Sequence, residues 1–166
     1  MNLTFYNPIN EKLSSPILEE IFTLNENNKP ALGGLESLER LKELYDFSML
    51  CGCSFFNQKL IAFCLLMDQS SNYDSPNYSY FKAKYDEFLY IDRVAVQADY
   101  QRRGTGTLLY ENLYRLSKQS NIPLCCEVNT FPLNQQSLDF HFKNKFQIID
   151  EVDFGKKKVA MLVKQP

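Results

Sequence analysis

Residues 88–117 (FLYIDRVAVQADYQRRGTGTLLYENLYRLS) constrain the fold more than any other part of the chain. Residues 88–96 are rich in β-branched and aromatic types, as expected for a largely buried strand. Leu109, Leu113 and Leu116 then recur at i, i+4 and i+7, which places them on one face of a helix. The stretch therefore predicts a strand followed by a helix, with a polar loop between them.

The loop between this strand and this helix has the sequence Gln101-Arg102-Arg103-Gly104-Thr105-Gly106. Its glycines let the backbone approach a ligand closely and present N–H groups to it. The start of the helix adds about half a positive charge from its dipole. Arginine side chains can hold phosphate oxygens with paired hydrogen bonds. We therefore expect this loop to bind a phosphorylated, anionic ligand.

The rest of the chain predicts six more strands and three more helices around this unit. The strands are expected at 2–6, 49–56, 59–67, 123–128, 146–154 and 157–164, and the helices at 14–24, 36–47 and 134–145. A chain of 166 residues suits one domain with a sizeable core, so we expect residues 1–166 to form a single domain. The strand–helix–strand unit over 88–128 should be a parallel crossover.

Residues 68–86 (DQSSNYDSPNYSYFKAKYD) form a long, polar and tyrosine-rich connection. Connections of this length are usually functional or disordered, and the aromatic residues argue against disorder. We expect a flap over the substrate side of the protein. Its tyrosines (Tyr73, Tyr78, Tyr80 and Tyr85) would form either a wall of the substrate site or part of the core.

Composition argues against several classes of function. The net charge of −2 and the pI near 5.5 give no basic footprint for nucleic acid. No apolar run reaches the length of a membrane span, so we expect a soluble, cytoplasmic protein. The five cysteines contain no Cys-x-x-Cys pair and there is one histidine, so we expect no metal site and no disulfide framework.

The loop motif resembles the acetyl-CoA signature Gln/Arg-x-x-Gly-x-Gly/Ala of the GNAT superfamily of N-acetyltransferases. The strand before it and the helix after it are the context in which that signature occurs. The resemblance covers roughly residues 15–164, and residues 73–78 and 88–93 look like a little-characterised bacterial subgroup of these proteins. It implies an α/β (α+β) fold with a mixed, mostly antiparallel twisted sheet of six or seven strands and about four helices.

The resemblance also implies which residues would hold acetyl-CoA. The strand backbone would pair with the pantetheine arm, the loop and helix start would hold the pyrophosphate, and two asparagines would contact the pantetheine amides. The residues so implied are Val94, Ala95, Val96, Gln101, Arg102, Arg103, Gly104, Thr105, Gly106, Thr107, Asn129 and Asn134. A backbone N–H of the strand end would also stabilise the oxyanion of the tetrahedral intermediate.

Acetyl transfer to an amine needs a base, because an alkyl ammonium ion has a pKa near ~10 and is not a nucleophile. Glu127 lies among mostly apolar neighbours in the predicted strand 123–128, and such neighbours raise the pKa of a carboxyl toward useful base strength. Its position also matches the glutamate that ribosomal-protein alanine acetyltransferases use as a base. A structural, hydrogen-bonded glutamate is the alternative.

Asp92 is a second candidate base or a ligand for the substrate ammonium, because an unpaired charge in an apolar strand would be costly. The neighbouring Arg93 should point to the opposite face of the strand. Tyr90 occupies the position where histone acetyltransferases of the superfamily carry their glutamate. His141 matches the tyrosine that protonates the CoA thiolate in many members, and an imidazole with a pKa near ~6.5 can donate a proton at neutral pH. A packed, hydrogen-bonded core histidine is the alternative.

The sequence therefore predicts an acetyl-CoA-dependent N-acetyltransferase that acts on the primary amine of a small molecule, an amino acid or a peptide N-terminus. A non-catalytic CoA-binding sensor or scaffold is the alternative. A Rossmann-type nucleotide enzyme fits poorly, because Leu109 stands where its third glycine should be. By analogy with other symmetric oligomers, the last strands could pair in a homodimer.

Overall fold

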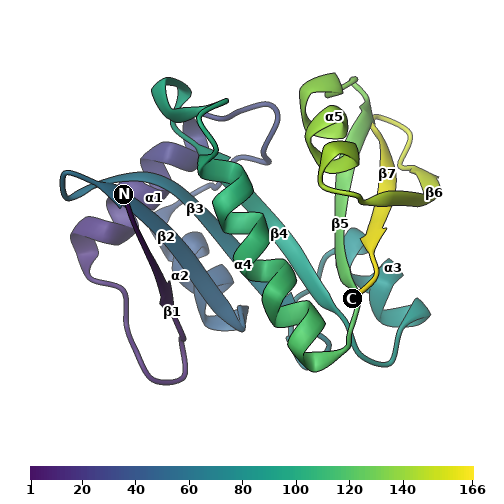
Figure 1. Cartoon of the computed structure of the whole chain (residues 1–166), viewed down its shortest axis with the longest axis horizontal. Coiled ribbons are helices and arrows are strands. Elements are labelled where there is room, and N and C mark those ends of the chain that lie inside the picture. Colours follow the sequence, from purple (N-terminus) through teal and green to yellow (C-terminus); the bar gives the residue numbers. More distant parts are fainter.

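The computed structural model of the protein describes residues 1–166 and contains one seven-stranded sheet with helices on both faces (Figure 1). The strands are β1 (Asn2–Tyr6), β2 (Leu50–Phe56), β3 (Lys59–Asp68), β4 (Leu89–Val96), β5 (Leu124–Phe131), β6 (Gln147–Asp153) and β7 (Lys158–Lys164). The helices are α1 (Ser15–Glu26), α2 (Leu38–Phe47), α3 (Pro76–Lys84), α4 (Thr105–Ser120) and α5 (Gln135–Lys143), with a 3₁₀ turn, η1 (Ala98–Tyr100). None of these helices combines the length and the hydropathy needed to cross a bilayer.

The strands follow the order β1-β2-β3-β4-β5-β7-β6 across the sheet. β4 and β5 are parallel, and every other neighbouring pair is antiparallel. α4 connects the two parallel strands, as expected for a crossover over residues 88–128. The predicted fold class, a mixed and mostly antiparallel sheet with helices, is therefore confirmed.

Local sequence explains where several helices begin and end. The side chain of Asn134 accepts a hydrogen bond from the backbone N–H of Ser137 and so caps the start of α5. The side chain of Ser37 caps α2 in the same way by accepting from Arg40. Asn121, at the end of α4, has the left-handed backbone that commonly closes a helix.

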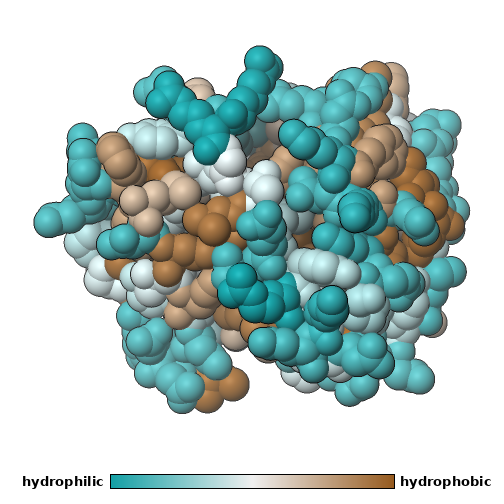
Figure 2. Space-filling model, in the orientation of Figure 1, coloured by the Kyte–Doolittle hydropathy of each residue, from teal (hydrophilic) through white to brown (hydrophobic).

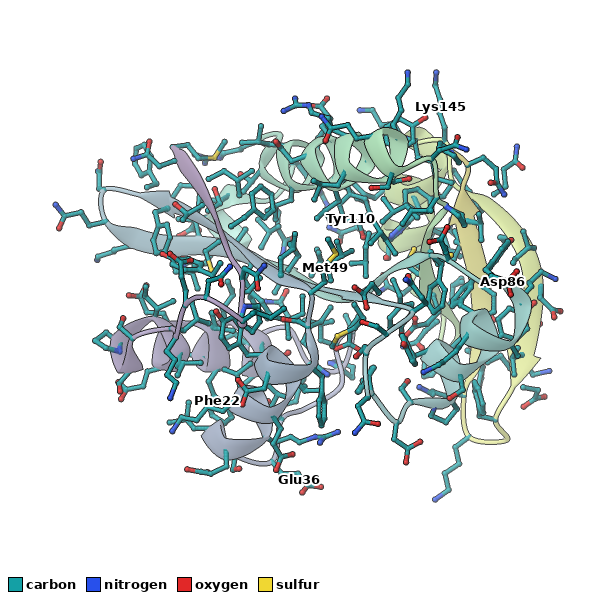
Figure 3. The ribbon with its side chains drawn as sticks, turned by 90° about the horizontal axis from the view of Figure 1, so that it is seen from below. Phe22, Glu36, Met49, Asp86, Tyr110 and Lys145 are labelled. Carbon is teal, nitrogen blue, oxygen red and sulfur yellow. The ribbon has the colours of Figure 1, made fainter.

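The two faces of the sheet carry separate parts of the core. Cys64 and Leu66 of β3 belong to the cluster beneath α4, whereas Phe63 and Leu65 belong to the cluster beneath α1 and α2. A third cluster joins α3 to β4, β5 and β7. Figure 3 shows α4 above the sheet and α1, α2 and α3 below it. This two-sided covering leaves the strands of the middle of the sheet almost fully buried.

Residues 68–86, expected to be a loop that forms a flap over the substrate side, contain a helix, α3, so the prediction of a loop was wrong. Three residues of the segment nevertheless line the cavity described below: Tyr73, Ser75 and Asn77. The buried residues of α3 are Asn77, Tyr78 and Phe81, which share one helical face. Tyr78 packs against Phe88 and Tyr90 and donates its hydroxyl hydrogen to backbone carbonyls. Asparagine and tyrosine count as polar in a sequence pattern, so they conceal this apolar face. For Tyr78, the alternative of a core residue is correct.

The parallel strands β4 and β5 separate soon after they begin. Only two residue pairs join them, Leu89 with Leu124 and Tyr90 with Cys125. Beyond Tyr90, the edge of β4 that faces β5 therefore has no partner strand. This gap lies at the carboxyl ends of two parallel strands, where open α/β sheets bind their ligands.

Gly52 of β2 gives a test of the packing around the first strands. A Cβ atom at Gly52 would lie 2.8 Å from Cys64 Sγ and 2.8 Å from Phe5 Cε1, closer than real contacts allow. We expect Gly52→Ala to lower the free energy of unfolding by about 1–3 kcal/mol, measured by urea denaturation. Gly33→Ala is the control, because nothing lies within 4 Å of its added Cβ. Equal stability of the two variants would contradict this account of the packing.

Candidate active site

A cavity of about 730 Å³ occupies the gap between β4 and β5 and has walls on both faces of the sheet. On one face, α4 and α5 contribute Tyr110 and His141, and Tyr110 lies between α4 and the sheet in Figure 3. On the other face, the connection between α1 and α2 contributes Leu32, and α3 contributes Asn77. A ligand bound on the α4 face can therefore meet a second ligand on the α3 face through the gap.

One end of the cavity is built to hold an anion. Gly104, just before α4, has a φ of +85°, a left-handed backbone that glycine adopts without strain. The first helical hydrogen bond runs from Leu108 N–H to Gly104 C=O, so the three preceding N–H groups have no partner within the helix. Arg102 lines the same end. Free N–H groups, a helix N-terminus and a guanidinium together suit a phosphate.

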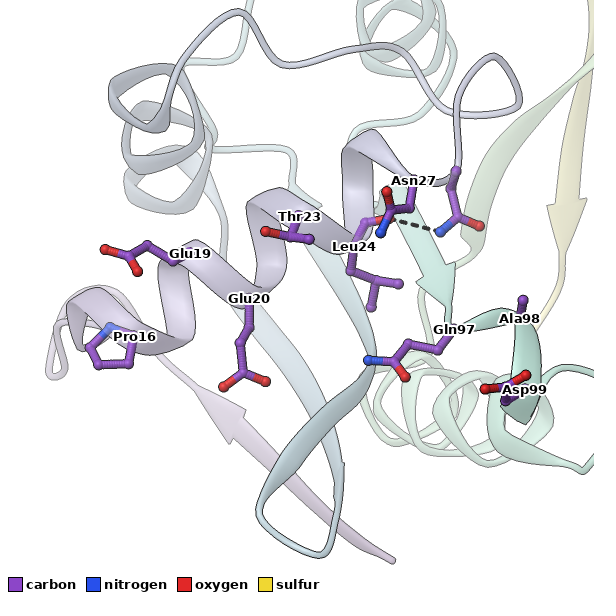
Figure 4. A pocket seen from close by; sticks show the side chains of 10 residues that line it. Pro16, Glu19, Glu20, Thr23, Leu24, Asn27, Gln97, Ala98 and Asp99 are labelled. Atoms are coloured by element: carbon purple, nitrogen blue, oxygen red, sulfur yellow. Dashed lines mark hydrogen bonds between the residues drawn. The ribbon is translucent and has the colours of Figure 1, made fainter.

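A second groove, of about 700 Å³, lies between α1 and η1 (Figure 4). Its charged lining residues are Glu19, Glu20 and Asp99, and neither lysine nor arginine lines it. Such a surface repels anions. We therefore assign phosphate binding to the cavity between β4 and β5.

The free edge of β4 forms a wall in the middle of this cavity. Val94 and Val96 line the cavity, whereas Ala95 is buried in the core beneath α1 and α2. Gln101 closes the end of the strand by donating from Nε2 to the Val96 carbonyl at 3.0 Å. Because a strand edge without a partner presents its own N–H and C=O groups, an extended ligand chain can pair with it.

Glu127 of β5 lies on the α3 side of the gap and is held at both carboxylate oxygens. Asn77 donates from Nδ2 to Oε1 at 2.7 Å, and the Tyr90 hydroxyl donates to Oε2 at 2.7 Å. Burial raises the pKa of Glu127 from its ordinary value of 4.5 to about 7; the charge of Asp92 adds to this increase. At neutral pH, Glu127 is therefore a carboxylate that can take up a proton.

Asp92 is paired with Arg93, contrary to the expectation that these neighbours point to opposite faces. Arg93 Nε lies 2.9 Å from Asp92 Oδ2, and the Asp92 side chain is only 5% exposed. The cause is a bulge in β4: Leu65 pairs with Arg93 and Leu66 with Ile91, so Asp92 is an extra residue. A bulge interrupts the alternation of side chains along the strand. Asp92 is therefore compensated within the protein.

Both ring nitrogens of His141 are occupied. Nδ1 lies 2.7 Å from the Ser137 carbonyl, which can only accept, so Nδ1 carries the proton. Nε2, 2.8 Å from the Tyr110 hydroxyl, is then the acceptor. Burial lowers the pKa of His141 to about 4. The ring is therefore neutral at neutral pH, which differs from the solvent-like imidazole assumed from the sequence.

Comparison with known proteins identifies the family. The family model for the acetyltransferase (GNAT) family matches residues 18–146, which is most of the chain. The chain belongs to the GNAT family. The resemblance inferred from residues 101–106 is thus confirmed, and with it the expected enzyme class, an acyltransferase. No curated protein matches the chain at the sequence level.

Solved GNAT structures share the fold at low sequence identity. The ribosomal-protein-S18-alanine N-acetyltransferase from Escherichia coli has 15% identity and a TM-score of 0.69, over 99% of this chain and 94% of that chain. An aminoglycoside 6′-N-acetyltransferase complexed with coenzyme A has 12% identity and a TM-score of 0.73, over 99% and 97% of the two chains. Naa20 from Chaetomium thermophilum, in complex with a bisubstrate analogue, has 16% identity and a TM-score of 0.72, over 99% and 86%.

Most site residues predicted from the GNAT resemblance line one cavity. They are Asp92, Val94, Val96, Gln101, Arg102, Gly104, Gly106, Thr107, Glu127, Asn129, Asn134 and His141. Three predicted residues do not line it. Ala95 is in the core, Thr105 is buried with its hydroxyl donating to the Tyr100 carbonyl, and Arg103 is exposed outside the cavity walls.

Asn77 and Tyr110 are two of the polar cavity residues that sequence reasoning missed. Asn77 lies in the segment expected to be a flap, and Tyr110 lies on α4 next to the apolar stripe. Each becomes part of the site only because another element faces it. Asn77 contacts Glu127, which is 50 residues away, and Tyr110 contacts His141, which is 31 residues away. Local patterns contain no signal for contacts at such separations.

The raised pKa of Glu127 predicts a pH-dependent gain of stability when its charge is removed. The carboxyl ionises near 4.5 when unfolded and near 7 when folded, so ionisation destabilises the folded state increasingly from pH 4.5 to 7. We expect Glu127→Gln to raise the unfolding temperature at pH 8 and to raise it less at pH 5, measured by calorimetry. Exposed Glu87→Gln is the control. A Glu127→Gln variant that is less stable than the native protein at pH 8 would contradict the assignment.

Proposed function

We propose that the protein transfers an acetyl group from acetyl-CoA directly to a primary amine, in a complex that contains both substrates. The amine belongs to a small molecule, an amino acid or a peptide N-terminus. The observation that carries the proposal is that one cavity joins an anion-binding loop to Glu127, a carboxylate whose pKa is about 7. A non-catalytic CoA-binding module would have no need for a buried base opposite the loop.

The chain offers groups for the pyrophosphate, the pantetheine arm and the thioester of acetyl-CoA. The N–H groups at the start of α4 and the Arg102 guanidinium would hold the pyrophosphate. The free edge of β4 would pair with the pantetheine arm, and Asn129 and Asn134 would contact its amides. A backbone N–H among Val94, Ala95 and Val96 would stabilise the oxyanion. These contacts would place the thioester carbonyl in the gap beside Glu127.

Glu127 would supply the base. It takes a proton from the substrate ammonium, directly or through a water, so that the nitrogen lone pair can attack the thioester carbonyl. A C–N bond then forms and the C–S bond breaks, which releases coenzyme A as a thiolate that takes up a proton. We assign the base to Glu127 rather than Asp92, because Asp92 is paired with Arg93.

The proton for the thiolate would come from the face occupied by α4 and α5. His141 carries its proton on Nδ1, where the Ser137 carbonyl holds it, so direct donation from an imidazolium ion is disfavoured. Tyr110, whose hydroxyl is hydrogen-bonded to His141 Nε2, lines the same part of the cavity. We therefore propose that His141 acts together with Tyr110 at the leaving-group end of the site.

The net charge of −2 favours neither nucleic acid nor an anionic membrane as a partner. We propose that residues 1–166 act as one cytoplasmic domain.

We also propose a homodimer that forms through the last strands. Figure 2 supports it, because apolar side chains gather at the edge of the molecule near α5 and β6. Phe142 is 46% exposed and Ile148 is 47% exposed there.

The activity is tested by following thiol release from acetyl-CoA across a panel of primary amines. We expect turnover with at least one amine, and Glu127→Gln should lower kcat by about a hundredfold or more. Calorimetric titration of acetyl-CoA into the same variant should give an unchanged Kd, because Glu127 is not part of the phosphate end. Absence of turnover with every amine, despite tight acetyl-CoA binding, would favour the non-catalytic alternative.

Arg102 and Arg103 test how the chain holds the phosphates. Arg102 lines the cavity and Arg103 does not, although they are neighbours in the same motif. We expect Arg102→Ala to raise the KM for acetyl-CoA by about tenfold, the usual effect of losing one hydrogen bond to a charged group. Arg103→Ala should raise it less, and kcat should change little in both. Equal effects of the two variants would show that the loop binds phosphate in another way.

A further inference from the structure

The carboxylate of Glu127 is bound by side chains from two other elements of the fold. Asn77 comes from α3 and Tyr90 from β4, and each donates a hydrogen bond of 2.7 Å to a different carboxylate oxygen. Asn77 is 7% exposed and Tyr90 is 0% exposed. The two donors therefore fix the plane of the carboxylate from the buried side, which leaves its remaining lone pairs for the cavity.

Neither donor has another hydrogen-bond partner. The Tyr90 hydroxyl bonds only to Glu127, and the amide nitrogen of Asn77 bonds only to Glu127. The other end of the Asn77 amide, Oδ1, is buried and has no partner at all. An unsatisfied buried carbonyl lowers stability. The hydrogen bond to Glu127 is therefore the one polar contact that the Asn77 side chain makes within the protein.

The same two contacts act on the proton affinity of Glu127. Burial and the charge of Asp92 favour the protonated form, whereas hydrogen bonds from Tyr90 and Asn77 favour the carboxylate, as does the charge of Lys157. Asp92 is itself paired with Arg93. Tyr110 of α4 and Cys126 of β5 lie on the other face of the sheet, where the charge of Glu127 adds to the effect of burial in raising their pKa values, so both stay protonated at neutral pH. Without the two donors, the pKa of Glu127 would be higher, and a smaller fraction of Glu127 would be ionised and able to accept a proton at neutral pH.

We propose that Asn77 and Tyr90 are positioning residues that hold the Glu127 carboxylate in the gap and set the pH range in which it accepts a proton from the amine. This inference rests on the proposed role of Glu127 as the base. It also gives α3 a function. Tyr78 and Phe81 anchor the helix in the core. Asn77 directly precedes Tyr78, so this anchoring holds Asn77 against Glu127.

The test compares variants that lose one donor each. Tyr90→Phe removes only the hydroxyl, and Asn77→Leu removes the amide while keeping a similar volume. Tyr78→Phe is the matched control: its ring lies 5.7 Å from that of Tyr90, but its hydroxyl bonds to the carbonyls of Asp68 and Ser71. Circular dichroism and the unfolding temperature establish that each variant is folded.

The first readout is an NMR titration of the protein labelled with ¹³C at the glutamate carboxyls, which needs no activity. The resonance of Glu127 is identified by its absence in Glu127→Gln. We expect its titration midpoint, near 7 in the native protein, to rise by about one pH unit in Tyr90→Phe and in Asn77→Leu, as expected when a carboxylate loses a hydrogen bond. Tyr78→Phe should leave it unchanged. An unchanged or lowered midpoint in Tyr90→Phe and Asn77→Leu would overturn the proposal.

The second readout is the pH dependence of kcat/KM with an amine that the native protein acetylates. The acidic limb of the profile should move to higher pH by the same amount as the NMR midpoint, and the rate should recover at high pH. A loss of rate by the same factor at every pH would show a merely structural role and overturn the proposal. If no amine is acetylated, the proposed function is contradicted. The inference about Asn77 and Tyr90 is still decided, because the NMR titration shows whether these two residues set the proton affinity of Glu127.

Discussion

The separation of β4 from β5 beyond Tyr90 is the feature on which the rest of the site depends. Two paired residues join these parallel strands, and after them the edge of β4 is free. The backbone groups that a neighbouring strand would use become available to an extended ligand. The same gap connects the two faces of the sheet, so the anion-binding loop on the α4 side and Glu127 on the α3 side share one cavity. A continuous sheet would keep them apart.

The proton affinity of Glu127 results mainly from the cost of burying its charge. A carboxylate in this partly buried position is held at a pKa of about 7 by burial, and Tyr90 and Asn77 keep it from rising further. Close to Glu127, the charge of Asp92 is compensated by its ion pair with Arg93. The result is one carboxylate that can exchange a proton near neutral pH and, beside it, a second carboxylate that is paired with a cation. Different surroundings can give two neighbouring carboxylates separate roles.

Much of the fold could be predicted from local patterns. The strand, glycine loop and helix over 88–117 follow from hydrophobic periodicity and from residues with special backbone preferences, and both are properties of neighbouring residues. The wrong predictions have a different origin. α3 was missed because two of its three buried residues, Asn77 and Tyr78, carry polar groups. The pairing of Asp92 with Arg93 was missed because a bulge depends on the register with β3, which the sequence of β4 alone does not contain.

By itself, the sequence determined the order of the strands and of the other four helices, the glycine loop before α4 and the family, because short-range periodicity, glycine conformation and motif spacing are encoded locally. It also singled out Glu127 as an acidic residue among apolar neighbours. The tertiary structure alone decided what surrounds that residue. Asn77, 50 positions away, and Tyr90, 37 positions away, reach its carboxylate only after α3 and β4 are packed against β5. Burial and hydrogen bonding depend on distances in space, so the proton affinity of Glu127 is a property of the folded chain.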